Sequence, residues 1–202
     1  MILHALLIGS LVGVVVGSLG AGGGIVSVPV LVYILGQNPH QATGLSLIIV
    51  GLTAAVSLAT RARSGSVAWP EGTIFAFAGL AGTWAGAALT GFLTGFFGVG
   101  GGFAIVPALH LALRYPMKRA SATSLLVMVI TAAFGLASRT LSGTLTITAQ
   151  AVAMVALFTG ASMVGGFVGA RLTARVSNRV LGLVFAALLI IVAASTLAAT
   201  LA

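Results

Sequence analysis

The sequence predicts an all-α polytopic membrane protein built as an inverted internal repeat, with broken or half-helices at two glycine triplets. The 202-residue chain is 59% hydrophobic and only 5% charged, and its mean hydropathy of +1.24 lies far above the range of soluble domains. Apolar runs near the length of about 20 residues that crosses a bilayer as a helix recur along the chain. The elements "GAGGGIVSVPVL" (20–31) and "GVGGGFAIVPAL" (98–109) are near copies of each other.

Each helix is expected where an apolar run lies between glycine-rich or polar breaks. The expected helices cover residues 2–20, 25–36, 44–60, 72–98, 103–113, 121–141, 148–170 and 180–202. Segments 25–36 and 103–113 are too short to span, because about 12 residues give roughly 18 Å of helix against a hydrocarbon core of about 30 Å. We therefore predict that a half-helix follows each glycine triplet. The N-terminal run lacks the basic start of a signal peptide and is interpreted as a retained first helix.

A shift of 78 positions aligns residues 13–65 with residues 91–143 without a gap, and 21 of the 53 pairs are identical. The identities include polar residues and a proline in register, which a background rich in Leu, Ala and Gly would not produce, so the pattern indicates an internal repeat. Among the identical pairs are Gly13 and Gly91, Gly17 and Gly95, Pro29 and Pro107, Ser46 and Ser124, Thr53 and Thr131, Arg61 and Arg139, and Gly65 and Gly143. We expect a first repeat at 1–89 and a second at 90–202, which together form one transmembrane domain.

The basic residues predict how the two repeats are oriented. Eight of the nine fall in three groups, which are Arg61 with Arg63, then Arg114, Lys118 and Arg119, then Arg171, Arg175 and Arg179. An even number of segments separates consecutive groups, so all three can face the cytoplasm as the positive-inside rule requires. Arg139, the repeat partner of Arg61, then lies on the other side, so we predict inverted repeats, as in many secondary transporters. The arginines are interpreted as anchors that extend to the membrane interface.

The first repeat is expected to be truncated at its C-terminal end. The second repeat continues past the aligned region through a basic loop and a further helix, whereas only "GTWAGAALT" (82–90) precedes the second copy. We therefore predict that a basic loop and a helix are missing near Leu89 and Thr90, so that 72–98 joins the ends of two helices. The loss removes two crossings and leaves the predicted orientations unchanged.

The glycine triplets predict an anion site. A half-helix that starts inside the membrane presents unpaired N–H groups and the positive end of its dipole, and glycine lets a ligand approach the backbone closely. Inverted repeats bring two such starts together near the midplane. The candidate substrate-binding amides are those of Gly22, Gly23, Gly24, Gly100, Gly101 and Gly102. The alternative for glycine-rich segments is close helix packing, which is our interpretation of the flanking "GVVVG" (13–17) and "GFLTG" (91–95).

A stripe of small and hydroxyl-bearing residues predicts further donors. Ala42, Ser46, Thr53 and Ser57 fall within an arc of about 60° on their helix. The repeat places Ala120, Ser124, Thr131 and Gly135 in the equivalent arc, with Thr123 beside them. Ser46, Thr123 and Ser124 are therefore candidate donors to the oxygens of an anion. The alternative is that these hydroxyls bond to neighbouring helices.

Several classes of function have little support in the sequence. Glu71 is the single acidic residue and there is no cysteine, so no metal constellation, carboxylate pair or thiolate is present, and we expect neither an enzyme nor a cofactor. The net charge of +8 is explained by membrane orientation, so nucleic acid is not an expected partner. Interfacial or packing roles are expected for His4, His40, His110 and Glu71.

The doubled pattern "GxGGGxxxVPxL", followed by "ATGLSL" (42–47) and "SATSLL" (121–126) and later by "GARL" (169–172), resembles the sulfite exporter TauE/SafE family of membrane permeases. The resemblance covers most of the chain. It implies a multi-pass inner-membrane protein with two related halves that moves sulfur-containing anions such as sulfite, sulfoacetate or other organosulfonates.

These observations predict a secondary transporter that moves a small anion across the inner membrane by alternating access. The expected partners are that anion and the lipid bilayer, and the sequence leaves a homo-oligomer open. Two alternatives remain, a non-transporting scaffold subunit that uses its basic loops to dock a partner, and a passive anion channel.

Overall fold

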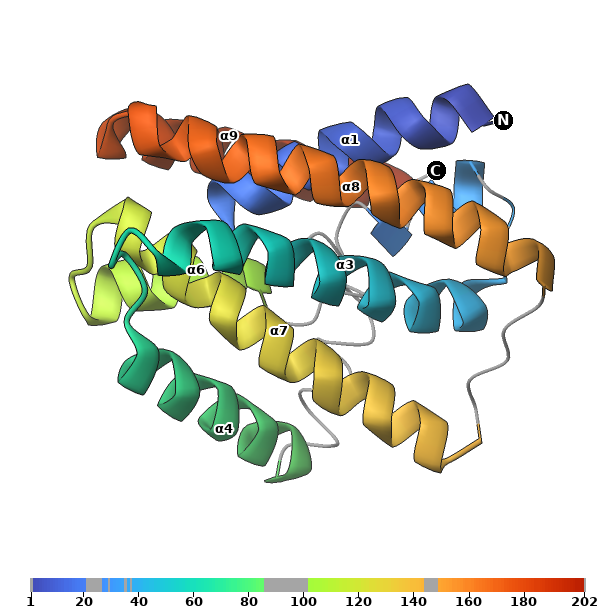
Figure 1. The fold of residues 1–202 in the computed structure, drawn as a ribbon, viewed down its shortest axis with the longest axis horizontal. Coiled ribbons are helices and arrows are strands. Elements are labelled where there is room, and N and C mark those ends of the chain that lie inside the picture. Colours follow the sequence, from blue (N-terminus) through green and yellow to red (C-terminus); the bar gives the residue numbers. More distant parts are fainter. Residues whose placement is uncertain are drawn as a thin grey trace.

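The structure of the protein, a computed structural model, describes residues 2–20, 27–28, 30–34, 36, 38–85, 102–143 and 149–201. Within these ranges the regular elements are all helical, as predicted. They are α1 (Ile2–Leu19), the π-helical turn η1 (Val30–Ile34), α3 (Pro39–Ala62), α4 (Trp69–Ala85), α6 (Gly102–Ala112), α7 (Met117–Leu141), α8 (Ala149–Arg175) and α9 (Asn178–Leu201). Figure 1 shows most of them running along the longest axis of the molecule.

Three helices in the described ranges are long and apolar enough to cross a bilayer. These spans are Gln41–Ala62 in α3, Met117–Leu141 in α7 and Val155–Arg175 in α8, and the apolar helices Leu6–Leu19 and Asn178–Ile191 are shorter. The exposed side chains of these helices include many large hydrophobic ones, such as Leu52, Val164 and Ile190. An apolar surface of this extent suits contact with lipid.

The observed bounds differ from the predicted ones mainly at the starts of α3 and α7 and at the end of α8, which extends past residue 170 to Arg175. α3 begins at Pro39 because proline fits the first turn of a helix, where its missing N–H is not needed. α7 likewise begins directly after Pro116. The short second half-helix is confirmed as the 11-residue α6. Of the first half-helix, predicted at 25–36, the structure describes a helical residue pair at 27–28 and the π-helical turn η1.

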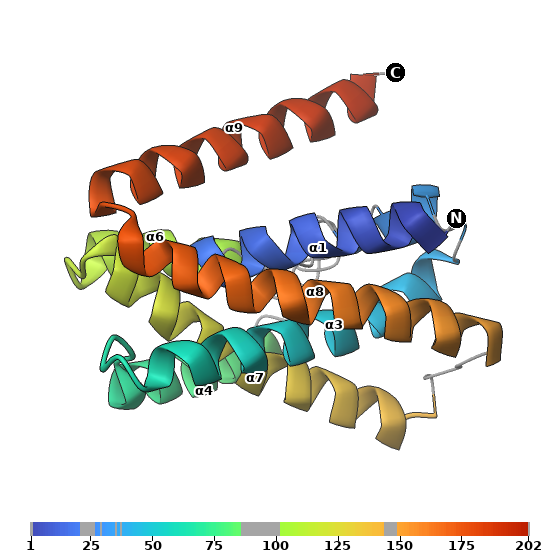
Figure 2. The ribbon, with the colours of Figure 1, turned by 45° about the horizontal axis from the view of Figure 1, so that its top comes forward.

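α3 and α7 form the centre of the bundle. α3 packs against α7, α8 and α1, while α4 and α6 pack against α7. α9 contacts the rest through Leu181 and Phe185, which join a buried cluster with Met117. Leu188 and Leu189 pack against the same cluster, and toward its C-terminal end α9 diverges from the bundle, as Figure 2 shows.

α1 and α8 are in close contact through small residues. A Cβ added at Gly13 or at Gly17 would overlap the backbone of Ser162 or of Gly166, respectively. Ser162 also donates a hydrogen bond from Oγ to the carbonyl of Gly9, at 2.9 Å. The packing interpretation of "GVVVG" is therefore confirmed, whereas "GFLTG" lies outside the described residues.

The inverted arrangement of the repeats is visible in α3 and α7, which the repeat alignment pairs. Arg61 near the end of α3 bonds to Ser121 near the start of α7, at 2.6 Å. Arg139 near the end of α7 bonds to Thr43 near the start of α3, at 3.0 Å. These two equivalent helices therefore run antiparallel (Figure 1), and the equivalent residues Arg61 and Arg139 lie at opposite ends of the bundle.

Candidate functional site

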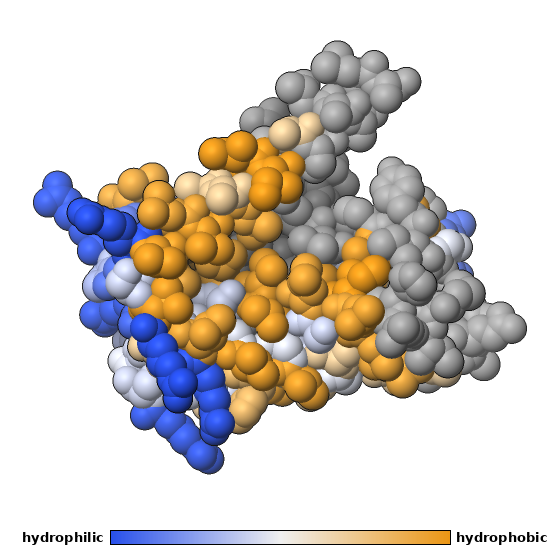
Figure 3. Space-filling view, turned by 90° about the horizontal axis from the view of Figure 1, so that it is seen from above, coloured by the Kyte–Doolittle hydropathy of each residue, from blue (hydrophilic) through white to orange (hydrophobic). Residues whose placement is uncertain are grey.

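The three predicted basic groups meet at one end of the bundle. Lys118 at the start of α7 donates from Nζ to the carbonyl of Ala174 near the end of α8, at 3.0 Å, and its backbone N–H bonds to Asn178 Oδ1 at the start of α9. Figure 3 shows hydrophilic side chains gathered at one end, beside a hydrophobic flank. This clustering agrees with the predicted positive-inside orientation.

Arg61 is buried at this end, with only 6% of its surface exposed. Its Nη1 donates to Ser121 Oγ on α7, and its Nη2 lies within hydrogen-bond distance of the carbonyls of Gly17 and Ser18 on α1 and of Thr173 Oγ1 on α8. The side chain therefore joins four helices. Its Nε has no hydrogen-bond partner in the described part of the chain.

This position corrects the prediction that the arginines act only as interfacial anchors. Arg61 closes the last turn of a span that packs on three other helices, so its side chain points into the bundle. The carbonyls it meets belong to a segment more than forty residues away in sequence. The one sequence signal for a special role was the identity between Arg61 and Arg139 in the repeat.

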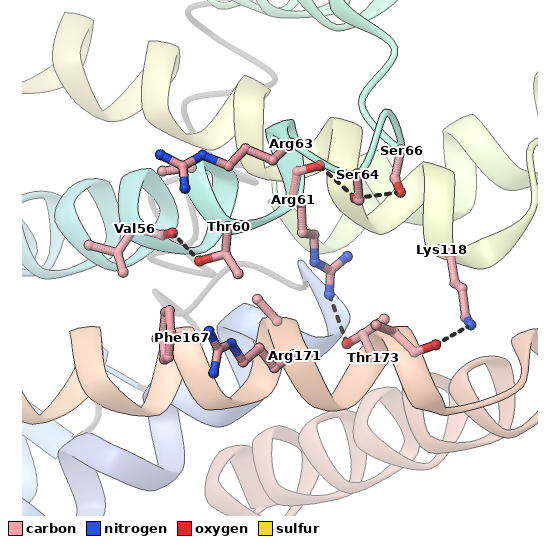
Figure 4. Close-up of a pocket in the computed structure, with 13 residues that line it drawn as sticks. Val56, Thr60, Arg61, Arg63, Ser64, Ser66, Lys118, Phe167, Arg171 and Thr173 are labelled. Carbon is pink, nitrogen blue, oxygen red and sulfur yellow. Dashed lines mark hydrogen bonds between the residues drawn. The ribbon is translucent and has the colours of Figure 1, made fainter.

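A cavity of about 590 Å³ lies between α3 and α8 at the basic end, beside Arg61 (Figure 4). It is lined by Val56, Ala59, Thr60, Arg61, Arg63, Ser64, Ser66, Lys118, Phe167, Ala170, Arg171, Thr173 and Ala174. Four of these side chains are cationic and none is acidic. The cavity is therefore suited to an anion.

The only side-chain carboxylate of the chain is engaged elsewhere. Glu71 Oε1, in the first turn of α4, accepts a hydrogen bond from the Tyr115 hydroxyl at 2.9 Å. Its own backbone N–H and this bond hold the pKa of Glu71 below its usual value, and the same bond raises the pKa of Tyr115. Glu71 thus stays ionised. It accepts a hydrogen bond from Tyr115 and is not among the described acceptors of Arg61.

The three predicted hydroxyl donors are all buried, but each is engaged in the structure. Ser46 Oγ donates to the Thr43 carbonyl of its own helix at 2.8 Å. Thr123 Oγ1 accepts a bond from the backbone N–H of Ala68 at 3.1 Å, just before α4 begins. Ser124 Oγ lies 2.9 Å from the carbonyls of Gly20 and of Ser121. For Thr123 and Ser124 these contacts agree with the alternative interpretation, in which the hydroxyls bond to neighbouring segments of the chain.

Most of the predicted glycine amides cannot be placed. Gly22, Gly23, Gly24, Gly100 and Gly101 lie outside the described residues, while Gly102 is the first residue of α6. The glycine that opens the first element can be placed. Gly20 has a left-handed φ of +62°, and a Cβ there would overlap Ser121 and Ser124. The first glycine-rich element therefore begins in direct contact with α7 of the other repeat.

Three buried hydroxyls have no hydrogen-bond partner among the described residues. They are Ser27 in the first glycine-proline element, Thr53 in the predicted stripe of α3, and Thr159 on α8. A buried hydroxyl without a partner costs free energy, so such groups are often reserved for a ligand or water. The sequence singled out Thr53 but contained no signal for Thr159, which has no repeat partner inside the aligned region.

Comparison with known proteins is consistent with this architecture. The sequence profile of the family described as "Sulfite exporter TauE/SafE" matches residues 5–90 and again residues 87–196. A probable membrane transporter protein of Xylella fastidiosa is 32% identical over 244 aligned positions, covering 91% of this chain and 92% of the relative. A probable membrane transporter protein of Bacillus subtilis is 32% identical over 52% of this chain and 36% of its own length. A third, from Methanocaldococcus jannaschii, is 52% identical over 25% of this chain and 18% of its own length. No solved structure matches the chain significantly.

The alignment with the Xylella protein has more positions than the chain has residues. The relative therefore contains residues with no counterpart here. The two segments matched by the family profile meet at 87–90. The predicted loss of a loop and a helix is at the same place, and it stays a prediction because residues 86–101 lie outside the described ranges.

Proposed function

The chain belongs to the sulfite exporter TauE/SafE family of membrane transporters, and on that premise we propose that it is a secondary transporter for a small oxyanion of the sulfite or organosulfonate class. Transport would proceed by alternating access between the two inverted repeats. The substrate class is supported by the family description, and the charge of the substrate is supported independently by the chain's own residues.

The observation that carries the proposal is the environment of Arg61. A buried cation is costly unless an opposite charge or a full set of hydrogen bonds compensates it. The described acceptors of Arg61 are neutral, its Nε has no described partner, and the adjoining cavity adds Arg63, Lys118 and Arg171 without an acid. An anion entering this cavity would supply the missing charge.

The chemistry of a sulfonate or sulfite suits this cavity. Both present several acceptor oxygens around one sulfur, and a guanidinium offers a planar fork of donors that can bind two such oxygens at once. Thr60 and Thr173 add hydroxyls to the lining. We propose that the cavity is the entry to the path and that the amides of the glycine triplets, with Ser46, Thr123 and Ser124, contact the anion further inside.

The test is flux of radiolabelled sulfoacetate and of sulfite into proteoliposomes. Arg61→Gln is expected to abolish saturable uptake, while Arg61→Lys retains part of it because the charge remains. Arg175→Gln is the matched control, since Arg175 is exposed at the same end of the bundle and does not line the cavity. Uptake equal in all variants would contradict the proposal.

Two further outcomes separate the alternatives. Uptake that does not saturate with anion concentration indicates a passive channel, and no uptake of any anion by folded protein indicates a scaffold.

Because Arg61 also joins helices, Lys118→Gln is a second test that leaves the contacts of Arg61 in place. Gly23→Leu and Gly101→Leu test the triplets, and unchanged uptake in both would remove these glycines from the proposed site.

A further inference from the structure

The cavity between α3 and α8 has a lateral mouth on the lipid-facing flank. Val56, Ala59 and Arg63 line it from α3 and the turn that follows, and each is partly or fully exposed. Phe167 and Arg171 line it from α8 and are exposed as well. Residues 56, 59 and 63 recur at helical spacing, so they follow one face toward the basic end.

The flank beside this mouth is apolar. Leu52 on α3 is 45% exposed, and Val164 and Val168 on α8 are 65% and 50% exposed. All three lie within predicted membrane spans. Leu52 and Val164 lie on the side of the mouth away from the basic end, and Val168 directly follows Phe167. The two helices thus present apolar side chains toward the membrane centre, while the exposed Arg63, just after α3, and the exposed Arg171 on α8 lie toward the interface.

Two arginines line the mouth itself. The Arg171 guanidinium carbon lies 4.3 Å from the centre of the Phe167 ring, a cation–π contact that keeps the charge beside the apolar lining. In Figure 4, Arg63 and Arg171 extend to the same side of Arg61, on opposite sides of the gap between α3 and α8, whereas Lys118 lies on the other side. The two exposed arginines are therefore separate from the buried position of Arg61.

We propose that this mouth binds the phosphate of an anionic phospholipid, with the acyl chains lying along α3 and α8. A phosphodiester matches the two guanidinium groups, and the acyl chains match the apolar flank below them. A headgroup with net negative charge is favoured because no acid lines the cavity to pair with the ammonium of a zwitterionic lipid. Basic pockets between transmembrane helices on the cytoplasmic side are typical of such lipid sites.

At the rim of the cavity, outside the buried position of Arg61, a free anion is a poorer match than a lipid. A small hydrated oxyanion gains nothing from contact with Val56, Phe167 and the exposed apolar side chains beyond them. An acyl chain is itself apolar, so it can lie against these side chains without exposing them to water. The lipid site uses Arg63 and Arg171, which also add positive charge to the cavity proposed for the transported anion, but its test measures lipid binding and no transport. Its failure and the failure of the proposed function are therefore distinguishable.

The experiment is native mass spectrometry of delipidated protein titrated with phosphatidylglycerol or phosphatidylcholine. The test variant is Arg63→Gln with Arg171→Gln, and the control is Arg175→Gln with Arg179→Gln, which removes the same charge from exposed positions at the same end. Each arginine that contacts the lipid phosphate is expected to contribute about five-fold to binding, so the test variant should bind phosphatidylglycerol about 25-fold more weakly. The control variant should keep the affinity of the unmodified chain, and phosphatidylcholine should bind weakly to all three.

Equal loss in the test and control variants would overturn the proposal, because the effect would then be one of net charge. Preference for phosphatidylcholine would overturn it too. A soluble source of phosphate is tested by adding glycerol phosphate or inorganic phosphate. Binding of either one through Arg63 and Arg171, without retention of phosphatidylglycerol, would replace the lipid with a free phosphate ligand.

Discussion

Arg61 on α3 and Thr173 on α8 join the two repeats through a hydrogen bond of 2.8 Å between Nη2 and Oγ1. Both side chains are buried. The Thr173 hydroxyl also lies within hydrogen-bond distance of the carbonyl oxygens of Ser18 and Gly169, at 3.0 and 2.9 Å. It can therefore accept from Arg61 and donate to a carbonyl at the same time, which makes it a link between α3, α8 and α1.

Thr173→Val should destabilise the protein. The substitution keeps the shape of the side chain but removes an acceptor for a buried cation, and a hydrogen bond to a charged group contributes about 2 kcal/mol. The thermal unfolding midpoint in detergent is the measurement. Thr140→Val is the control, because the exposed Thr140 hydroxyl bonds to Ala137 of its own helix. Equal midpoints for the two variants would contradict the role of Thr173.

Gly165→Ala should loosen the contact between α1 and α8. A Cβ at this position would overlap the backbone of Ser10, so the helices must separate, and overpacking of this kind costs about 1–3 kcal/mol. Gly160→Ala on the same helix is the control, since a Cβ there meets nothing within 4 Å. The control should be neutral or up to about 1 kcal/mol more stable, because alanine has the higher helix propensity.

Gly20→Ala should cost more than Gly65→Ala. Both glycines have left-handed φ values, of +62° and +65°, so each substitution incurs backbone strain of about 1–2 kcal/mol. A Cβ at Gly65 meets open space, whereas one at Gly20 also overlaps Ser121 and Ser124. The difference in stability between the two variants measures the contact of the first glycine-rich element with α7, and a difference near zero would show that this contact is not tight.

Ser64→Cys and Ser142→Cys should be labelled from opposite sides of the membrane. The two serines are repeat partners that follow Arg61 and Arg139, and both are exposed. The chain has no cysteine of its own, so each variant carries a single thiol. In intact cells an impermeant maleimide should label only Ser142→Cys, and Ser64→Cys should react after permeabilisation. Labelling of both from one side would contradict the inverted repeat.

The bond between Glu71 and Tyr115 should make stability depend on pH in acid. The pKa of Glu71 is lowered in the folded state, so its contribution is present above the unfolded value near 4.5 and is lost as the pH falls through the folded pKa. Tyr115→Phe removes the hydroxyl and should move this loss to higher pH. Unfolding midpoints measured between pH 3 and pH 7 on both proteins test the shift, and Glu71→Gln, which cannot ionise there, should show no such step.

The sequence by itself determined the class of the protein, its repeat and the opposite orientation of the two copies. Composition is sufficient for the class because only a helical bundle hides the backbone polar groups of so many apolar spans from lipid. The repeat and the distribution of arginines are sufficient for the inversion, since charge decides which loops stay in the cytoplasm. The paired positions of Arg61 and Arg139 at opposite ends of α3 and α7 follow from these two patterns.

Only the tertiary structure decided what the polar side chains do. Arg61 is buried because α1 and α8 bring the carbonyls of Gly17 and Ser18 and the hydroxyl of Thr173 to it from distant parts of the chain. Helical periodicity placed Ser124 on an inward face, but its bond to the carbonyl of Gly20 depends on how the first glycine-rich element meets α7. Such partners are fixed by packing between segments that are far apart in sequence, and no local pattern encodes them.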